Sequence, residues 1–206
     1  MTDAEIWQKV EDFRSLHRPY LDAEQNPLDL LTFVELQLRL DVIPYDGLSR
    51  NFSADAAVLG DFSGLYIDGH LFDRAETLRF GEQNRLRFSL AHEIGHIILH
   101  RALYENAGVA DRESLLEWLN DHLGEKYRIE REANEFAGRL LVPIDVMSPL
   151  FDQLAKGYDM IHGAHGWQKD QELRKAACEL MGQKFGIHPQ GMSVRLDREG
   201  LWPSIF

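Results

Sequence analysis

The segment 88–100 reads Phe-Ser-Leu-Ala-His-Glu-Ile-Gly-His-Ile-Ile-Leu-His, and it decides how the rest of the chain is interpreted. His92, Glu93 and His96 stand in it in the order His-Glu-x-x-His, among apolar or small residues. On a helix, two histidines four positions apart project from the same face, so their imidazoles can share one Zn²⁺. Glu93 would then lie beside the open position of the metal, where its carboxylate could accept a proton from water.

This motif is typical of zinc peptidases, but so short a pattern also arises by chance. The alternative is a buried helix whose histidines are satisfied by backbone carbonyls. Burying three polar side chains among Leu90, Ile94 and Ile97 without a metal or partners would cost on the order of 1–3 kcal/mol each. We therefore favour the metal site over the purely structural helix.

The overall composition is that of a globular protein with its own core. Of the 206 residues, 44% are hydrophobic and 27% are charged, which fits one domain or one domain with a small appendage. The formal net charge of −12 argues against a broad nucleic-acid-binding surface. The first residues lack the features of a signal peptide, and no apolar run is long enough to span a bilayer. We expect a cytoplasmic protein.

Cysteine usage limits the chemistry of any metal site. Cys178 is the single cysteine, so neither an intrachain disulfide nor a thiolate cluster can form. Its apolar neighbours indicate a small core residue. A metal would have to be held by histidines and carboxylates.

The chain before the motif alternates helical and β-type patterns. Apolar residues at helical spacing predict helices over residues 3–18 and 27–40, and residues 42–45 read as a short strand in which Pro44 indicates a sheet edge or a strand end. Two β-rich runs within 56–72 then predict a small antiparallel sheet beside the helix that carries His92 and His96. Its edge strand could hold a substrate peptide in extended form, or the sheet could simply cover the helix.

We place the active helix over residues 85–99, with Asn84 as its N-cap. Gly95 in the middle of this helix suits a site where another backbone approaches closely. His100 and His122 are weaker site candidates, because a core or surface role is more common for such histidines.

The second half of the site lies in segment 128–143, where Ala133, Phe136, Ala137, Leu140 and Leu141 form one helical stripe. Glu130 stands at the N-terminal end of this stripe and is the expected third ligand. Asn134, one turn later, could hydrogen-bond that carboxylate and orient it. Glu132 competes as the ligand, although its phase places it nearer the flank of the stripe.

Two motifs together are more specific than either alone. Segment 87–100, with Glu-Arg-Glu-Ala-Asn-Glu-Phe-Ala at 130–137 and Leu-Leu-Val-Pro at 140–143, resembles the ImmA/IrrE family of zinc metallopeptidases. The resemblance extends to Phe-Gly-Ile-His-Pro-Gln-Gly-Met-Ser-Val-Arg-Leu-Asp-Arg-Glu-Gly-Leu at 185–201, and covers roughly residues 40–201.

The resemblance implies a gluzincin-like α+β fold, mostly helical, with His92, His96 and Glu130 as zinc ligands and Glu93 as catalytic base. It also implies that the substrate is a helix-turn-helix repressor of the Cro/C1 type, whose cleavage switches on stress-response or mobile-element genes. We expect a metallopeptidase domain with N-terminal helices over residues 1–168, and a C-terminal helical appendage over 169–206 packed on it.

The segment 156–167 is rich in glycine and histidine, and its composition predicts a flexible loop. Such a loop could close over the site as a lid, with Tyr158, His162 or His165 donating to the oxyanion. The interpretation we favour is an exposed insertion without a catalytic role.

The C-terminal helices, expected over 171–184 and 189–198 with Gly186 between them, have the outline of a helix-turn-helix. The second helix offers only Arg195 and Arg198, each close to acidic residues, so it lacks a basic face that could follow a phosphate backbone. Direct DNA binding is therefore not expected, and packing or repressor docking is.

A non-catalytic alternative remains open at this stage. The chain could be a zinc-stabilised regulatory module, for example in a toxin–antitoxin pair, that binds a partner without cutting it. A structural zinc site has a closed shell of four protein ligands, whereas a catalytic site keeps one position open. Neither the scissile bond nor the oligomeric state can be deduced from the sequence.

Overall fold

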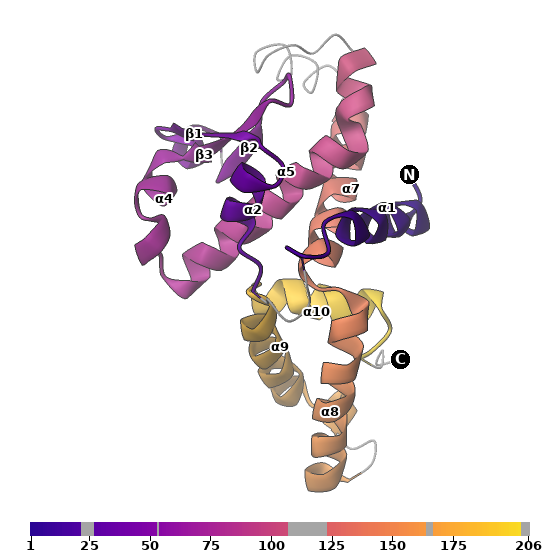
Figure 1. The fold of residues 1–206 in the computed structure, drawn as a ribbon. Coiled ribbons are helices and arrows are strands. Elements are labelled where there is room, and N and C mark those ends of the chain that lie inside the picture. Colours follow the sequence, from indigo (N-terminus) through magenta and orange to yellow (C-terminus); the bar gives the residue numbers. More distant parts are fainter. Residues whose placement is uncertain (22–26, 53, 107–122, 164–166, 203–206) are drawn as a thin grey trace.

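The structure, a computed structural model, describes residues 1–21, 27–52, 54–106, 123–163 and 167–202 (Figure 1). Its two long helices, α5 (Phe80–Asn106) and α7 (Leu123–Leu141), pack against each other. The other elements are α1 (Asp3–Leu16), α2 (Leu30–Leu36), β1 (Asp41–Tyr45), α3 (Leu48–Phe52), β2 (Ala56–Val58), β3 (Gly64–Asp68), α4 (Gly69–Asp73), the 3₁₀ turns η2 (Ala75–Thr77) and η3 (Trp167–Lys169), α8 (Ile144–His162), α9 (Gln171–Phe185) and α10 (Pro189–Arg198). The α+β class expected from the sequence is confirmed.

The contact between α5 and α7 is unusually close at Gly95. A Cβ atom added there would lie 3.2 Å from both the Cα and the carbonyl oxygen of Ala133, and 3.3 Å from the Cβ of Phe136. Around this point Ile94, Ala133 and Phe136 are completely buried. The sequence-based expectation of a close backbone approach is therefore confirmed, and the partner is α7.

The three strands form a mixed sheet in the order β1-β3-β2. The hairpin of β2 and β3 is antiparallel, as expected, and pairs Ala57 with Tyr66. The expectation of a wholly antiparallel sheet was wrong, because β1 pairs with β3 in parallel. Helix α3 and strand β2 intervene between β1 and β3, and this crossover lets the chain return along β3 in the direction of β1. The strand with Pro44 is at an edge, as expected.

Several element boundaries differ from the sequence-based expectation. Helix α5 begins at Phe80, so Asn84 is not its N-cap but a buried residue within the helix, where its Oδ1 accepts a hydrogen bond from Arg87 Nη1 at 3.0 Å. Helix α2 is shorter than expected and starts at Leu30, with the Asp29 side chain accepting from the Thr32 amide. The polar residue Asn84 misled the assignment at α5, and Pro27, a residue type favoured in the first turn of a helix, misled it at α2.

Residues 156–162 were expected in a flexible loop, but they form the last turns of α8. The composition misled because Gly157 is tolerated inside a helix, and the helix ends only at Gly163, whose φ is 79°. His122 and His165 lie outside the described residues.

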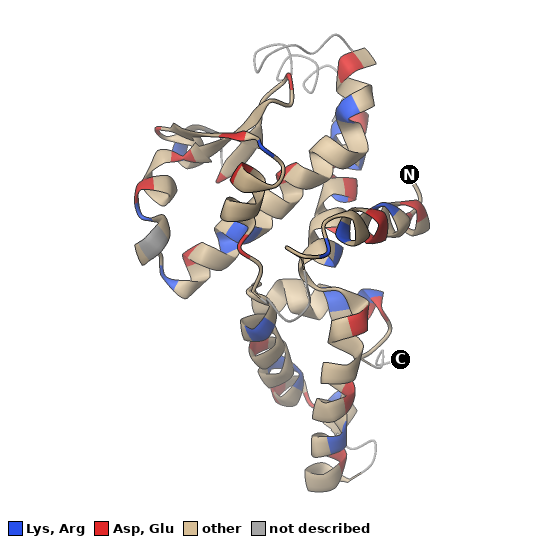
Figure 2. Cartoon of the chain, viewed as in Figure 1, with Lys and Arg blue, Asp and Glu red and all other residues tan. Residues whose placement is uncertain are grey.

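The C-terminal helices α9 and α10 agree closely with the expected ranges, and Gly186 joins them in the left-handed conformation with φ 65°. Arg195 of α10 is buried with 3% exposure, and its Nη2 donates to the Val142 carbonyl and to Glu199. Arg198 pairs with Asp3 at 2.9 Å. Both arginines considered for DNA binding are thus engaged within the molecule, and in the view of Figure 2 basic residues lie scattered among acidic ones. The domain boundary at 168/169 stays a prediction.

None of the helices described combines the length and apolar character needed to cross a membrane.

The contact at Gly95 can be tested with larger side chains. We expect Gly95→Val to push α5 and α7 apart and to lower the free energy of unfolding by about 1–3 kcal/mol, because the branched side chain meets the backbone of α7. Denaturant titration measures this loss. Gly157→Val is the matched control, since a Cβ there would meet nothing within 4 Å. Equal losses in the two variants would contradict the close contact.

Candidate metal centre

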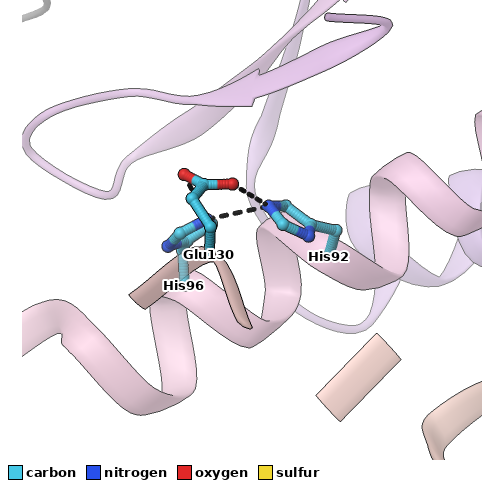
Figure 3. A group of neighbouring side chains, drawn as sticks. All are labelled: His92, His96 and Glu130. Carbon is cyan, nitrogen blue, oxygen red and sulfur yellow. Dashed lines mark hydrogen bonds and ion pairs between the residues drawn. The ribbon is translucent and has the colours of Figure 1, made fainter. Parts of the chain in front are cut away.

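Three potential ligand atoms converge where α5 and α7 meet. One atom each from His92, His96 and Glu130 lies within 4.8 Å of the others. The two Nε2 atoms are 2.9 Å apart, and the Glu130 carboxylate is 3.2 Å from His92 Nε2 and 3.7 Å from His96 Nε2. Figure 3 shows the carboxylate turned toward both imidazoles of α5.

The separations fit a zinc ion. Two ligand atoms bound tetrahedrally at about 2.0–2.1 Å from Zn²⁺ are about 3.3 Å apart. The 2.9 Å between the two Nε2 atoms and the 3.2 Å from His92 Nε2 to Glu130 Oε2 are close to this value, whereas the 3.7 Å from His96 Nε2 is measured to the other oxygen, Oε1. Nitrogen from histidine and oxygen from glutamate form a donor set common for catalytic zinc. The residues present therefore fit a metal of this kind.

The hydrogen bond of Asn134 supports this fit. Asn134 Oδ1 lies 3.1 Å from His92 Nδ1, and an amide oxygen can only accept, so Nδ1 carries the proton. In the neutral ring Nε2 then presents its lone pair to the cluster. The sequence-based expectation was that Asn134 would hold Glu130, and this was wrong. At position 134 the side chain reaches the imidazole on the facing helix instead.

The two imidazoles have different electrostatic surroundings. Burial lowers the pKa of His96 well below its usual value, and the neighbouring His92 and His100 add to this. Burial acts on His92 too, but Glu130 and Glu93 outweigh it and raise the pKa of that ring. His96 is therefore neutral near pH 7, which is the form that binds a metal.

Glu93 projects from α5 toward the sheet. Its carboxylate accepts a hydrogen bond of 2.8 Å from the backbone amide of Val58 in β2. Burial raises its pKa to about 7, although His92 and the Val58 amide act in the opposite direction. A carboxyl group with such a pKa can both accept and release a proton near neutral pH. The link to β2 could not be deduced from the motif.

The structure separates the two candidate third ligands. Glu130 belongs to the cluster, with a side chain that is 41% exposed. Glu132 is fully buried, and its carboxylate lies 3.1 Å from His100 Nε2 and 3.0 Å from Arg128 Nη1. The sequence-based preference for Glu130 thus agrees with the geometry.

Sequence reasoning gave His100 only as a weaker site candidate and missed Tyr104, and the structure places both beside His96. His96 Nδ1 lies 3.1 Å from His100 Nδ1 and 3.5 Å from the Tyr104 hydroxyl, and both residues are buried. The signal was present in the sequence, because 92, 96, 100 and 104 repeat every four residues and share one face of the helix.

The residues considered for a lid are not brought to this cluster. The Tyr158 hydroxyl donates to the Leu173 carbonyl at 3.1 Å, and its ring packs beside Trp167. His162 is exposed at the C-terminal end of α8, close to the Tyr158 ring. Of the candidates in segment 156–167, the described ones, Tyr158 and His162, therefore do not belong to the site.

A helix with two histidines and a buried glutamate, joined by a glutamate from a second helix, is the kind of site that defines zinc-type metallopeptidases. Residues 66–161, which include all four side chains, match the family model described as the IrrE N-terminal-like domain, peptidase family M78. Over these residues the resemblance to the ImmA/IrrE family is confirmed. No curated protein and no solved structure matches the chain.

The buried carboxyl of Glu93 predicts a pH-dependent stability. In the metal-free protein its pKa is raised from 4.5 to about 7, so the unfolded state loses this proton first as the pH rises. Below about pH 4.5 this group contributes up to about 3 kcal/mol to the free energy of unfolding, and this contribution is lost as the pH rises to about 7.

Glu93→Gln removes this titration while the amide oxygen can still accept from Val58. We expect the variant to gain stability relative to the wild type as the pH rises from 5 to 8, measured by urea unfolding in the presence of a chelator. Glu105→Gln, at a carboxylate that is 59% exposed, is the control. A wild-type-to-variant difference that stays constant over this range would contradict the raised pKa.

Proposed function

We propose that the protein is a zinc-dependent endopeptidase of the gluzincin type. The observation that supports this most is the convergence of His92, His96 and Glu130 beside the buried carboxyl of Glu93. These three side chains would hold the ion, which when bound supplies a Lewis acid that polarises the scissile carbonyl and acidifies water. The family match of residues 66–161 supports the same conclusion.

Glu93 is the proposed general base and general acid. Its carboxylate would accept a proton from the attacking water and then donate it to the nitrogen of the leaving amine. The Val58 amide fixes one carboxylate oxygen by its 2.8 Å hydrogen bond, so the orientation of the group is set before substrate arrives.

The cluster favours an enzyme over a structural zinc site. Among the described residues the group has three members, and His100, the nearest further histidine, uses its Nδ1 for His96. Three protein ligands with a fourth position for water or substrate is the catalytic pattern, whereas structural sites use four. We therefore prefer the peptidase to the non-catalytic binding module.

Strand β2 is the proposed support for an extended substrate. The Leu59 amide donates to the Gly64 carbonyl, and the Asp55 carbonyl accepts from the Asp68 amide. These two groups, which flank β2, therefore face β3. Because backbone groups alternate along a strand, those of Ala56 and Val58 face the opposite side, and the Val58 amide reaches Glu93. A peptide paired along this edge would pass the catalytic carboxyl.

A groove adjoins the centre on its other side. It is a cavity of about 360 Å³ between α5, α7 and α10, and its lining includes Glu130 of the metal cluster and Asn134, the partner of His92. Phe88, Ile187 and Val194 give it an apolar wall. We propose that apolar side chains of the substrate next to the scissile bond enter this groove.

The proposed substrate is a Cro/C1-type helix-turn-helix repressor, whose cleavage would switch on stress-response or mobile-element genes. This step relies on the resemblance to the ImmA/IrrE family, since a shared fold does not determine a substrate.

Two substitutions test the assignment of roles. We expect Glu93→Gln to bind zinc like the wild type but to cleave a candidate repressor about 10²- to 10⁴-fold more slowly. His96→Ala should lose both zinc and cleavage. Zinc content is measured by elemental analysis, and cleavage by the masses of the fragments. A Glu93→Gln protein that cuts at the wild-type rate would refute the proposed role.

The groove is tested by making its wall polar. Val194 is 51% exposed, so we expect Val194→Gln to fold normally but to lower kcat/KM by roughly 5- to 30-fold, mainly through KM, because about 1–2 kcal/mol of apolar contact is lost. Leu180→Gln on α9 is the matched control, since Leu180 is 60% exposed and does not line the groove. The same kcat/KM in both variants would rule the groove out as a substrate site.

A further inference from the structure

A chain of hydrogen bonds leads from the metal cluster into the protein interior. His96 Nδ1 lies 3.1 Å from His100 Nδ1, and His100 Nε2 lies 3.1 Å from a carboxylate oxygen of Glu132. These residues have exposures of 4%, 2% and 0%, so water does not compete for the bonds. The His100 and Glu132 side chains are not used by the proposed mechanism.

Glu132, at the interior end of these hydrogen bonds, determines which atoms along them donate and which accept. Glu132 also accepts from Arg128 Nη1 at 3.0 Å and from the Met1 amine at 2.5 Å. Both donors are cationic, and Glu132 forms an ion pair with each of them, which favours the charged form of its carboxyl group. The group is therefore an ionised carboxylate, which can only accept hydrogen bonds.

The protons of both imidazoles follow from this carboxylate. Because Glu132 can only accept, His100 Nε2 must donate to it, and His100 Nδ1 in the neutral ring is then an acceptor. His96 Nδ1 must accordingly donate to His100, which leaves the lone pair on His96 Nε2. That lone pair faces His92 Nε2 and Glu130, where the metal would be held.

We propose that His100 and Glu132 are positioning residues that hold His96 in the tautomer that binds the metal. The inference rests on the proposed metal site but concerns residues outside the ligand set. His96 Nδ1 then donates to His100, just as His92 Nδ1 donates to Asn134 Oδ1. Such partners orient the ring and increase its basicity toward the ion.

Tyr104 is the competing partner of His96 Nδ1. Its hydroxyl is 3.5 Å away, at the limit of a hydrogen bond, and it could donate to that nitrogen and so favour the opposite tautomer. The shorter contact to His100 and the buried carboxylate behind it favour the chain through Glu132. The two possibilities assign the His96 proton to different nitrogens, which makes them separable by experiment.

The first experiment reads the tautomers in the metal-free wild-type protein. Ring ¹⁵N chemical shifts are recorded near pH 8, above the usual histidine pKa of about 6.5. We expect the proton of His96 on Nδ1 and that of His100 on Nε2. A His96 ring with its proton on Nε2 would overturn the proposal.

The second experiment measures zinc affinity by competition with a chelator. Removing the acceptor with His100→Leu should weaken zinc binding by about 10- to 100-fold. His100→Asn keeps an acceptor oxygen at nearly the place of Nδ1 and should recover most of the affinity. Glu105→Gln, at an exposed carboxylate of the same helix, should bind like the wild type.

The outcomes distinguish this inference from the proposed function. If the wild type binds zinc and His96→Ala does not, but folded His100→Leu binds like the wild type, then only the positioning role fails. If the wild type binds no zinc, the proposed function fails, and the ring ¹⁵N shifts still decide the tautomer. Circular dichroism of each variant establishes that it is folded.

Discussion

The close contact of α5 with α7 at Gly95 is the constraint on which the site depends. Because glycine has no side chain, the backbone of α7 at Ala133 can lie directly against α5 at Gly95, one residue before His96. This contact sets how far Glu130 reaches, since Glu130 is one turn before Ala133 on the same helix. The helix pair therefore supplies the hydrophobic core and the metal-ligand geometry at the same place.

Polar groups at this crossing are held from several elements. Helix α7 contributes Asn134 to His92 and Glu132 to His100, and strand β2 contributes the Val58 amide to Glu93. The contacts of Glu132 and of the Val58 amide satisfy buried groups that would otherwise cost free energy in the core, and all three contacts fix an orientation. Preorganisation of this kind is what a catalytic site needs, because geometry set during folding need not be established in the reaction.

Much of the metal cluster could be predicted from the sequence, because its residues stand in two short segments with helical spacing. The spacing of His92 and His96, the identity of Glu130 and the meaning of Gly95 all follow from helical periodicity. Long-range contacts could not be predicted in this way. The partner of Asn134 depends on how the facing helix is rotated, the Val58 amide reaches Glu93 from the sheet, and the parallel pairing of β1 with β3 depends on a crossover. In segment 156–162, composition suggested a loop where the chain forms a helix.

The central claim is that His92, His96 and Glu130 hold one zinc ion beside Glu93. Anomalous diffraction at the zinc absorption edge, from crystals grown with zinc, tests it most directly. We expect one peak about 2.0–2.2 Å from the two Nε2 atoms and a Glu130 oxygen, with no fourth protein ligand. A peak that involves Glu132 or a fourth side chain, or no peak at these residues, would contradict the claim.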